Sequence, residues 1–187
     1  MKELIKKELN KFSLEPSLID NFIESVSEGL NQNGIEIWIN TIKSFSNSQT
    51  SRVIIKNIIE ETPAILRSIP QSQYLEWVKQ CYRISEVSED LSITYVNATT
   101  GVIENLKPRH LLDWGNIGLS LYRSSKNSTS LVNNFFKYSP SLCLKLNYEE
   151  LEILNDTLKR ISTRSISFSI KILDWVLKIS SITPSDL

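Results

Sequence analysis

Three tryptophans at nearly equal intervals constrain the fold more than any other feature of the sequence. Trp38, Trp77 and Trp114 are 39 and 37 residues apart, and Leu154 follows Trp114 after another 40. Each of the four belongs to an apolar set with offsets of −3, 0, +4 and +7, which places the set on one face of an α-helix. The sets are Ile35, Trp38, Ile42 and Phe45; Tyr74, Trp77, Cys81 and Ile84; Leu111, Trp114, Gly118 and Leu121; and Leu151, Leu154, Leu158 and Ile161. This recurrence predicts a helical repeat of about 39 residues.

A polar break and a second apolar run follow each of these helices. The second runs begin near Val53, Leu91, Leu131 and Ile166. One unit of this kind cannot bury its own apolar stripe, so neighbouring units must stack. We therefore predict an all-α fold, a HEAT-like helical repeat that forms a right-handed α-solenoid of three to four repeats. The expected repeats span about residues 35–72, 73–109, 110–147 and 148–187.

The residues before this array form a separate helical segment. Leu4–Phe12 and Leu18–Leu30 are amphipathic, and Glu15-Pro16 separates them. Asn33-Gly34 has the residue types of a helix C-cap, where the backbone often becomes left-handed. We therefore expect residues 1–33 to be a helical cap and residues 34–187 to be the repeat array.

A hydroxyl residue followed by proline or glycine recurs within the units. The dipeptides are Thr62-Pro63, Thr100-Gly101, Ser139-Pro140 and Thr183-Pro184. A hydroxyl can cap a helix, and proline is tolerated at the first helical position because its missing N–H has no intrahelical acceptor there. These dipeptides therefore predict a short third helix in each unit.

Two positions carry more specific local signals. Asn147 and Glu150 have the spacing of a capping box, in which each side chain bonds the backbone amide of the other residue. Gly118 stands where the other three units carry a larger residue. Glycine inside a helix costs about 1 kcal/mol relative to alanine, so we expect another helix to approach closely at Gly118.

The composition narrows the classes of function. Lys plus Arg and Asp plus Glu each number 21, so the chain lacks the basic excess that usually binds nucleic-acid phosphates. No apolar run reaches the roughly 18 residues of a membrane span, and Met1–Leu4 does not begin a secretory signal. We therefore expect a soluble, cytoplasmic protein with neither nucleic-acid nor membrane partners.

The sequence offers little material for a metal or cofactor site. Cys81 and Cys143 are far apart, and each lies among apolar residues, so we expect two buried thiols. A single histidine and the absence of a Gly-rich phosphate-binding motif leave neither a zinc site nor a nucleotide site to predict.

Several polar residues can be interpreted either as structural or as metal-binding or catalytic. Asp90–Thr94 matches the D-x-S-x-[ST] metal motif of von Willebrand type A domains, but a polar segment precedes it, so a helix start capped by Ser88 is favoured. His110 is expected to be a loop residue between units, because catalysis would need a nucleophile or carboxylate close to it. Asp113 and Asp174 are interpreted as solvated helix-face charges. No catalytic residue and no enzyme activity are predicted.

The third unit has a pattern that extends beyond its apolar stripe. It reads W-x-x-x-G-x-x-L-x-x-S from Trp114, then F-F-x-x-S-P-x-L-x-x-x-L from Phe135, then Glu150-Leu151. This pattern resembles the helical repeats that precede the von Willebrand type A domain in bacterial NorD- and CbbO-like proteins. The resemblance spans Ile35 to the end of the chain and is strongest between Leu111 and Leu151.

That resemblance implies a function. Proteins of this family work with hexameric MoxR-type AAA+ ATPases in the chaperone-like activation or assembly of metalloenzymes and rubisco. The chain departs from the family at Tyr122, which replaces a small residue, and at Leu154, which replaces tryptophan. No α/β region follows the repeats, so the chain corresponds to the helical portion alone and the metal-site residues of the type A domain have no counterpart.

The expected function is therefore a non-enzymatic protein–protein interaction module, an adaptor that couples a MoxR-type ATPase to a client enzyme. The alternative is a stand-alone helical-repeat scaffold with unrelated protein partners. A small-molecule-binding helical domain is a third possibility, and it would need a polar pocket near His110 or Asp113.

Overall fold

The computed structural model describes residues 2–45 and 48–179. This part of the chain is all-α, as the sequence predicted, and it has no strand. Its α-helices are α1 (Lys2–Leu9), α2 (Pro16–Gly29), α3 (Gln32–Ser44), α4 (Gln49–Ser68), α5 (Gln71–Val87), α6 (Glu89–Ile103), α7 (Leu111–Ser124), α8 (Thr129–Cys143), α9 (Tyr148–Ser162) and α10 (Ile166–Ile179). Two 3₁₀ turns, Asn10–Phe12 and Pro108–His110, join some of them.

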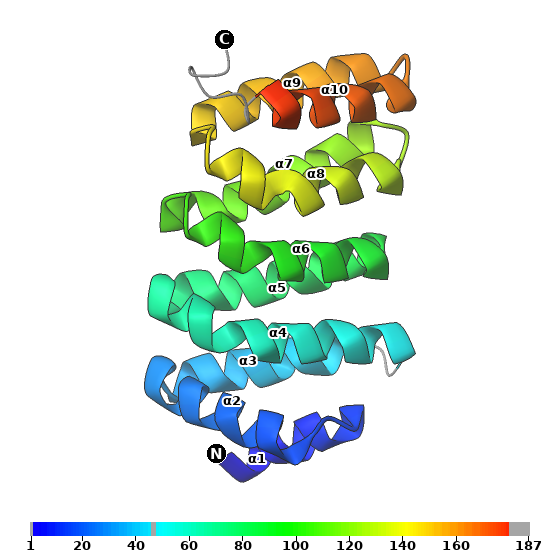
Figure 1. Ribbon diagram of the computed structural model, residues 1–187. Coiled ribbons are helices and arrows are strands. Elements are labelled where there is room, and N and C mark those ends of the chain that lie inside the picture. The colour runs from blue at the N-terminus through cyan, green and yellow to red at the C-terminus, as the bar shows by residue number, and fades with distance from the viewer. Residues whose placement is uncertain (1, 46–47, 180–187) are drawn as a thin grey trace.

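The helices form two layers along a stack (Figure 1). The odd-numbered helices α1, α3, α5, α7 and α9 make the first layer, in which each helix packs against the next. The even-numbered helices α2, α4, α6, α8 and α10 make the second layer in the same way. The chain therefore progresses from the α1 end of the stack to the α9–α10 end, and the first and last described helices lie far apart.

The tryptophan stripe lies at the boundary between the layers. Trp38, Trp77 and Trp114 are fully buried on α3, α5 and α7, and Leu154 is buried on α9. Neighbouring units meet through aromatic rings. Phe22 of α2 contacts Trp38 with ring centroids 4.7 Å apart, and Tyr95 of α6 stacks on Trp114 at 4.7 Å.

The prediction that these dipeptides begin short third helices is wrong. Pro63 lies inside α4 and Pro140 lies inside α8, and both helices continue past the proline. Thr62 and Ser139 are fully buried and are not helix caps, because their hydroxyls donate to the carbonyls of the residues four positions earlier, at 2.6 and 2.7 Å. Thr100-Gly101 likewise lies inside α6, where Gly101 packs against Pro140 of the next unit. Thr183-Pro184 lies outside the described residues.

Buried hydroxyls accept a hydrogen bond from two of the tryptophans, and the acceptors are Ser139 and Thr99, the residue before Thr100. The indole N–H of Trp77 donates to Thr99 at 3.0 Å, and that of Trp114 donates to Ser139 at 2.8 Å. In the first unit the Thr62 hydroxyl instead lies 2.8 Å from the hydroxyl of Tyr74. A buried indole N–H left without an acceptor costs free energy, so Thr99 and Ser139 stabilise the buried positions of Trp77 and Trp114.

The expected cap at Asn33-Gly34 is also wrong. Helix α2 ends at Gly29, and the next residue, Leu30, is extended. The Asn31 side chain then accepts from the backbone N–H of Gly34 at 2.8 Å and caps α3, so Asn33-Gly34 is the first turn of the following helix. Helix α3 thus begins at Gln32, two residues before the position 34 at which the repeats were expected to start, and α1 and α2 continue the same two layers.

Three other local predictions are confirmed. Asn147 and Glu150 form a reciprocal capping box, with N–H···O distances of 2.8 and 3.0 Å. The Ser88 hydroxyl caps α6. A Cβ built on Gly118 would lie well under 3.0 Å from the ring of Phe136, so α8 does approach α7 closely at this position.

Candidate functional site

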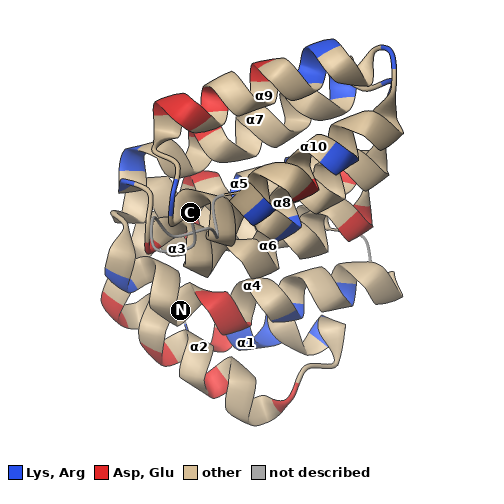
Figure 2. Ribbon diagram, turned by 45° about the horizontal axis from the view of Figure 1, so that its top comes forward, with Lys and Arg blue, Asp and Glu red and all other residues tan. Residues whose placement is uncertain are grey.

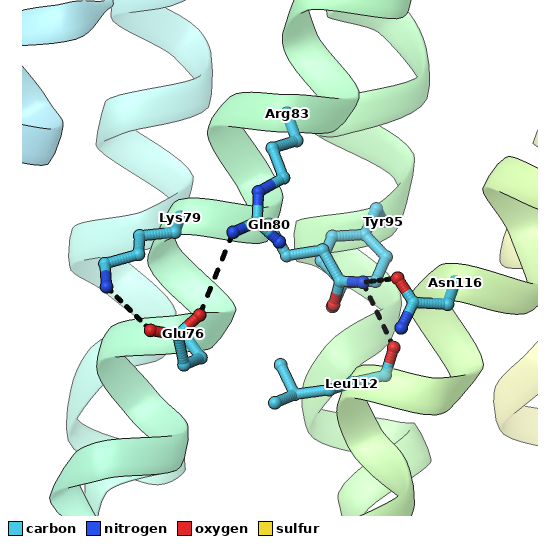
Figure 3. Close-up of polar contacts among 7 residues, drawn as sticks. All are labelled: Glu76, Lys79, Gln80, Arg83, Tyr95, Leu112 and Asn116. Atoms are coloured by element: carbon cyan, nitrogen blue, oxygen red, sulfur yellow. Dashed lines mark hydrogen bonds and ion pairs between the residues drawn. The ribbon is translucent and has the colours of Figure 1, made fainter.

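A buried polar joint connects α5, α6 and α7 (Figure 3). Gln80 of α5 is only 2 % exposed. Its amide nitrogen donates to the Leu112 carbonyl at 3.1 Å and to the Asn116 side-chain oxygen at 3.0 Å. Its amide oxygen accepts from the Tyr95 hydroxyl at 2.7 Å. We call these four residues the Gln80 joint, and both donors of the glutamine amide and its acceptor are satisfied within it.

A second glycine makes room for this joint. A Cβ on Gly115 would lie 2.5 Å from the side-chain Cδ of Gln80, so only glycine lets the amide lie flat against α7. Burial raises the pKa of Tyr95 well above its ordinary value, which keeps the phenol protonated as a donor. The joint therefore fixes the second unit against the third and offers no reactive group.

The exposed side of α5 carries charged side chains next to the Gln80 joint (Figure 3). Glu76 lies 2.6 Å from the Lys79 ammonium and 3.9 Å from the Arg83 guanidinium. The Glu76, Lys79 and Arg83 side chains are 42, 37 and 58 % exposed, so water screens these ion pairs and they contribute little to stability. Their side chains are consequently available to a partner.

An open groove lies between this side of α5 and α3. It has a volume of about 580 Å³ and is lined by Ile37, Asn40, Thr41, Ser44, Lys79, Tyr82, Arg83 and Glu86. The Tyr82 hydroxyl donates to Glu86 at 2.9 Å, and its ring meets Phe45 edge-on at 5.3 Å. We call this feature the α3–α5 groove. Its lining is mainly polar and includes a tyrosine held by two neighbours and an exposed arginine, two residue types that are enriched at interface hot spots.

The structure brings His110 and Asp113 near each other without pairing them. The His110 ring stacks on Tyr148 with centroids 4.1 Å apart, and Arg109 donates to its Nε2 at 3.0 Å. An accepting Nε2 places the proton on Nδ1, which lies 3.7 Å from the Asp113 carboxylate, too far for a hydrogen bond. Burial, and then the bond to Glu152, raise the pKa of Tyr148 well above its ordinary value.

Two small cavities flank this cluster. One of about 290 Å³ lies beside His110, between the loop before α7 and the start of α9, and the other of about 350 Å³ lies between α7 and α9. Polar and apolar side chains line both, and no serine, threonine or cysteine of the described residues lines the cavity beside His110. Asp174, on α10 in the other layer, neighbours Tyr138 and is not part of this cluster.

The cysteines and the acidic motif that could have suggested metal or redox chemistry lie in structural positions. Within residues 2–45 and 48–179 no three His, Cys, Asp or Glu side chains come together as metal ligands would. Cys81 and Cys143 are both buried free thiols, and burial raises the pKa of Cys81 well above its usual range and that of Cys143 to about 12. Asp90–Thr94 lies inside the first turns of α6, where the Thr94 hydroxyl donates to the Asp90 carbonyl at 3.1 Å.

A row of polar contacts joins neighbouring helices of the second layer. Glu89 accepts from the hydroxyls of Ser48 and Ser51, each at 2.9 Å, and these bonds hold its pKa below the usual value. Asn57 donates to Asn97 at 2.7 Å. Further pairs are Thr94 with Asn133 and Thr100 with Glu61. Each pair joins residues 38 to 41 positions apart, the same interval as the tryptophans, and this interval is the one signal that could have revealed the row from the sequence.

Charges of both signs are interspersed along the stack (Figure 2). On α9 the acids Glu149 and Glu150 lie in the first turn and the bases Lys159 and Arg160 in the last, which matches the helix dipole. No helix of the described residues has both the length and the apolar character needed to cross a membrane.

Comparison with protein-family models, with curated proteins and with solved structures found no match to this chain.

Proposed function

We propose that the chain is a non-enzymatic α-solenoid of about 39-residue repeats that binds another protein through the α3–α5 groove. The observation that carries this proposal is the groove itself. It is an open surface lined by Tyr82, Arg83 and Ile37, and it lies on the same helix as the buried, fully hydrogen-bonded amide of Gln80. Such a surface suits recognition of a protein segment more than chemistry on a small substrate.

The groove is suited to an extended or helical segment with an apolar anchor and an acidic neighbour. Ile37 and Tyr82 supply apolar contact area at the floor and wall. Tyr82 is held by Phe45 and Glu86, so it loses little conformational entropy on binding. Lys79 and Arg83 can break their ion pairs with Glu76 and form new ion pairs with a carboxylate of the partner. The loss of the exposed pairs would cost the fold little stability.

In its narrower form the proposal makes this module an adaptor between a MoxR-type AAA+ ATPase and a client enzyme. That form rests on the resemblance of the third unit, from Trp114 to Leu151, to NorD- and CbbO-like repeats. A stand-alone scaffold with unrelated partners is the second candidate, and the same groove would support it. The cavity beside His110, at about 290 Å³, lies at the lower limit for small-molecule pockets, so we do not favour a ligand-binding domain.

The test is direct binding of the purified chain to a purified MoxR-type ATPase, measured by biolayer interferometry together with the ATPase rate. Arg83→Glu should weaken binding at least tenfold, because it places a negative charge beside Glu86 in the groove. Arg164→Glu is the matched control, since Arg164 is also exposed but lies between α9 and α10. Binding that Arg83→Glu leaves unchanged would refute the groove as the site. No binding at all would refute the adaptor form.

A further inference from the structure

The last helix exposes an apolar face at one end of the stack. Phe168, Trp175 and Ile179 are 54, 65 and 50 % exposed, and Ile172 is partly exposed between them. All of these except Ile179 line a hollow of about 600 Å³, together with Lys171, Asp174 and Lys178. We call the four apolar side chains the α10 face. Such an exposed group is unusual, since large apolar side chains normally occur singly on a surface.

The position of this face in the repeat identifies it as a packing surface. Ser88, Ser128 and Ser165 each accept from the backbone N–H three residues later, which gives α6, α8 and α10 a common origin. The residues 3, 7 and 14 positions after these serines are Leu91, Tyr95 and Val102 in α6; Leu131, Phe135 and Leu142 in α8; and Phe168, Ile172 and Ile179 in α10.

All six equivalents in α6 and α8 are buried. Tyr95 reaches its buried position by stacking on Trp114 of the following unit. In α10 the same three positions are less buried: Phe168 and Ile179 are exposed, and Ile172 is only partly buried against the core. The α10 face is therefore built for contact with another helix.

The spacing of the face favours a second copy of α10 in that role. Its residues, at 168, 172, 175 and 179, are separated by four, three and four positions, so the pattern reads the same in both directions. Two antiparallel copies related by a two-fold axis near residues 173 and 174 would place Phe168 opposite Ile179 and Ile172 opposite Trp175. A 4-3-4 apolar seam is also the spacing with which two helices interlock along their length.

The opposite end of the stack is poorly suited to cover this face. The hollow between α1 and α2 is lined by Lys2, Glu3, Lys6, Asp20 and Glu24, and Lys6 lies 3.1 Å from Asp20. Covering these charges with the apolar α10 face would remove them from water without compensation. Head-to-tail stacking is thus disfavoured. A two-fold contact between identical patches closes on itself as a dimer.

We propose that the α10 face is the interface of a two-fold dimer of this chain, in which two stacks join end to end through antiparallel α10 helices. The proposal is independent of the α3–α5 groove, which lies on other helices. Trp175 gives it a direct reporter, because Trp38, Trp77 and Trp114 are fully buried within each chain and Trp175 alone is exposed.

The first experiment measures mass by sedimentation velocity and multi-angle light scattering over a concentration series. We expect twice the monomer mass, and loss of acrylamide quenching at Trp175 as the dimer forms. Trp175→Glu and Phe168→Glu should each give a monomer with unchanged helical circular dichroism. The control is Ile153→Glu, since Ile153 is 67 % exposed on α9 and outside the face, and it should remain dimeric. A wild-type monomer at every concentration, or dimers that survive both α10 variants, would overturn the proposal.

Disulfide trapping tests the antiparallel arrangement. A mixture of Phe168→Cys and Ile179→Cys chains should form a mixed disulfide, because the two positions face each other across the axis. Phe168→Cys alone should not cross-link, because its two copies would lie about 16 Å apart (11 residues at 1.5 Å each). The native Cys81 and Cys143 are buried and do not interfere. Rapid cross-linking of Phe168→Cys alone would exclude the antiparallel dimer.

Discussion

The closest approach between two helices gives the most demanding test of the packing, through the substitution Gly118→Ala. Intrinsic helix propensity favours this change by about 1 kcal/mol. The packing opposes it, because the new methyl group would lie well under 3.0 Å from the Phe136 ring, whereas ordinary contact begins at about 3.4 Å. The ring or the helix must therefore move by several tenths of an ångström at least.

The Phe136 ring has little room to move. It is fully buried, and it packs against Tyr95 at 5.2 Å, Trp114 at 5.3 Å and Phe135 at 5.8 Å between ring centroids. Over-packing of a tight core typically costs about 1–3 kcal/mol, and sometimes more. The limited freedom of this ring places the cost at the upper end, so we expect a net loss of about 1–2 kcal/mol after the propensity gain.

Thermal unfolding followed by circular dichroism measures this effect. A chain of this size loses about 2–4 °C in Tm for each kcal/mol, so Gly118→Ala should lower the Tm by roughly 2–8 °C. Gly29→Ala is the matched control, because its methyl group would meet only the flexible end of Leu66. Adding Phe136→Leu to Gly118→Ala should recover part of the loss. An unchanged or higher Tm for Gly118→Ala would refute the account of this contact.

Three further predictions follow from buried or bonded residues. Trp114→Ala should cost roughly 3–5 kcal/mol in urea unfolding, whereas Trp175→Ala should cost almost nothing in the monomer; equal losses would contradict the core placement of Trp114. Gln80→Ala leaves the Tyr95 hydroxyl and the Leu112 carbonyl without their partner and should cost about 1–3 kcal/mol, with Gln80→Glu as a comparison that keeps the shape. The pKa of Glu89 is lower in the folded chain than in the unfolded chain, so its contribution to stability is present above the unfolded pKa and is lost as pH falls through the folded pKa. Glu89→Gln should therefore flatten the acid side of a Tm–pH profile, and a parallel profile would contradict this.

The helices were predictable because each buries a stripe with a 3.6-residue period. That signal is strong in the sequence, and it located α3, α5, α7 and α9 around Trp38, Trp77, Trp114 and Leu154. It says little about helix ends, which depend on single side-chain bonds. Asn31 and Asn33 are equally plausible caps by residue type, and only the bond from the Gly34 amide decides between them.

The hydroxyl–proline dipeptides could not be interpreted locally for a related reason. A threonine or serine before proline is as consistent with a helix N-cap as with a buried back-bonded hydroxyl. The deciding partner is an aromatic residue of another helix: Trp114 lies 25 residues before Ser139, and Tyr74 lies 12 residues after Thr62. These pairs become visible only when the two layers pack together.

The Gln80 joint was missed because a glutamine on a helix normally indicates solvent. Its burial depends on Tyr95 and Asn116 of two other helices and on the absence of a side chain at Gly115. Gly115 was the available signal in the sequence. It lies one turn before Gly118, and each glycine inside a helix lowers helix stability relative to alanine, so two of them indicate close packing. The exposure of the apolar side chains on α10 could not be predicted either, because an apolar stripe has the same sequence pattern whether or not another helix covers it.

The two proposed surfaces have a combined consequence. A dimer joined through α10 would carry two α3–α5 grooves in one rigid particle, and a hexameric ATPase would offer several identical sites to it. Binding through both grooves would exceed the affinity of one groove by a factor set by their effective concentration. Trp175→Glu should then weaken binding to an immobilised hexamer and leave binding to a single isolated subunit unchanged. Arg83→Glu should weaken both, so the two variants separate the groove from the dimer interface in one experiment.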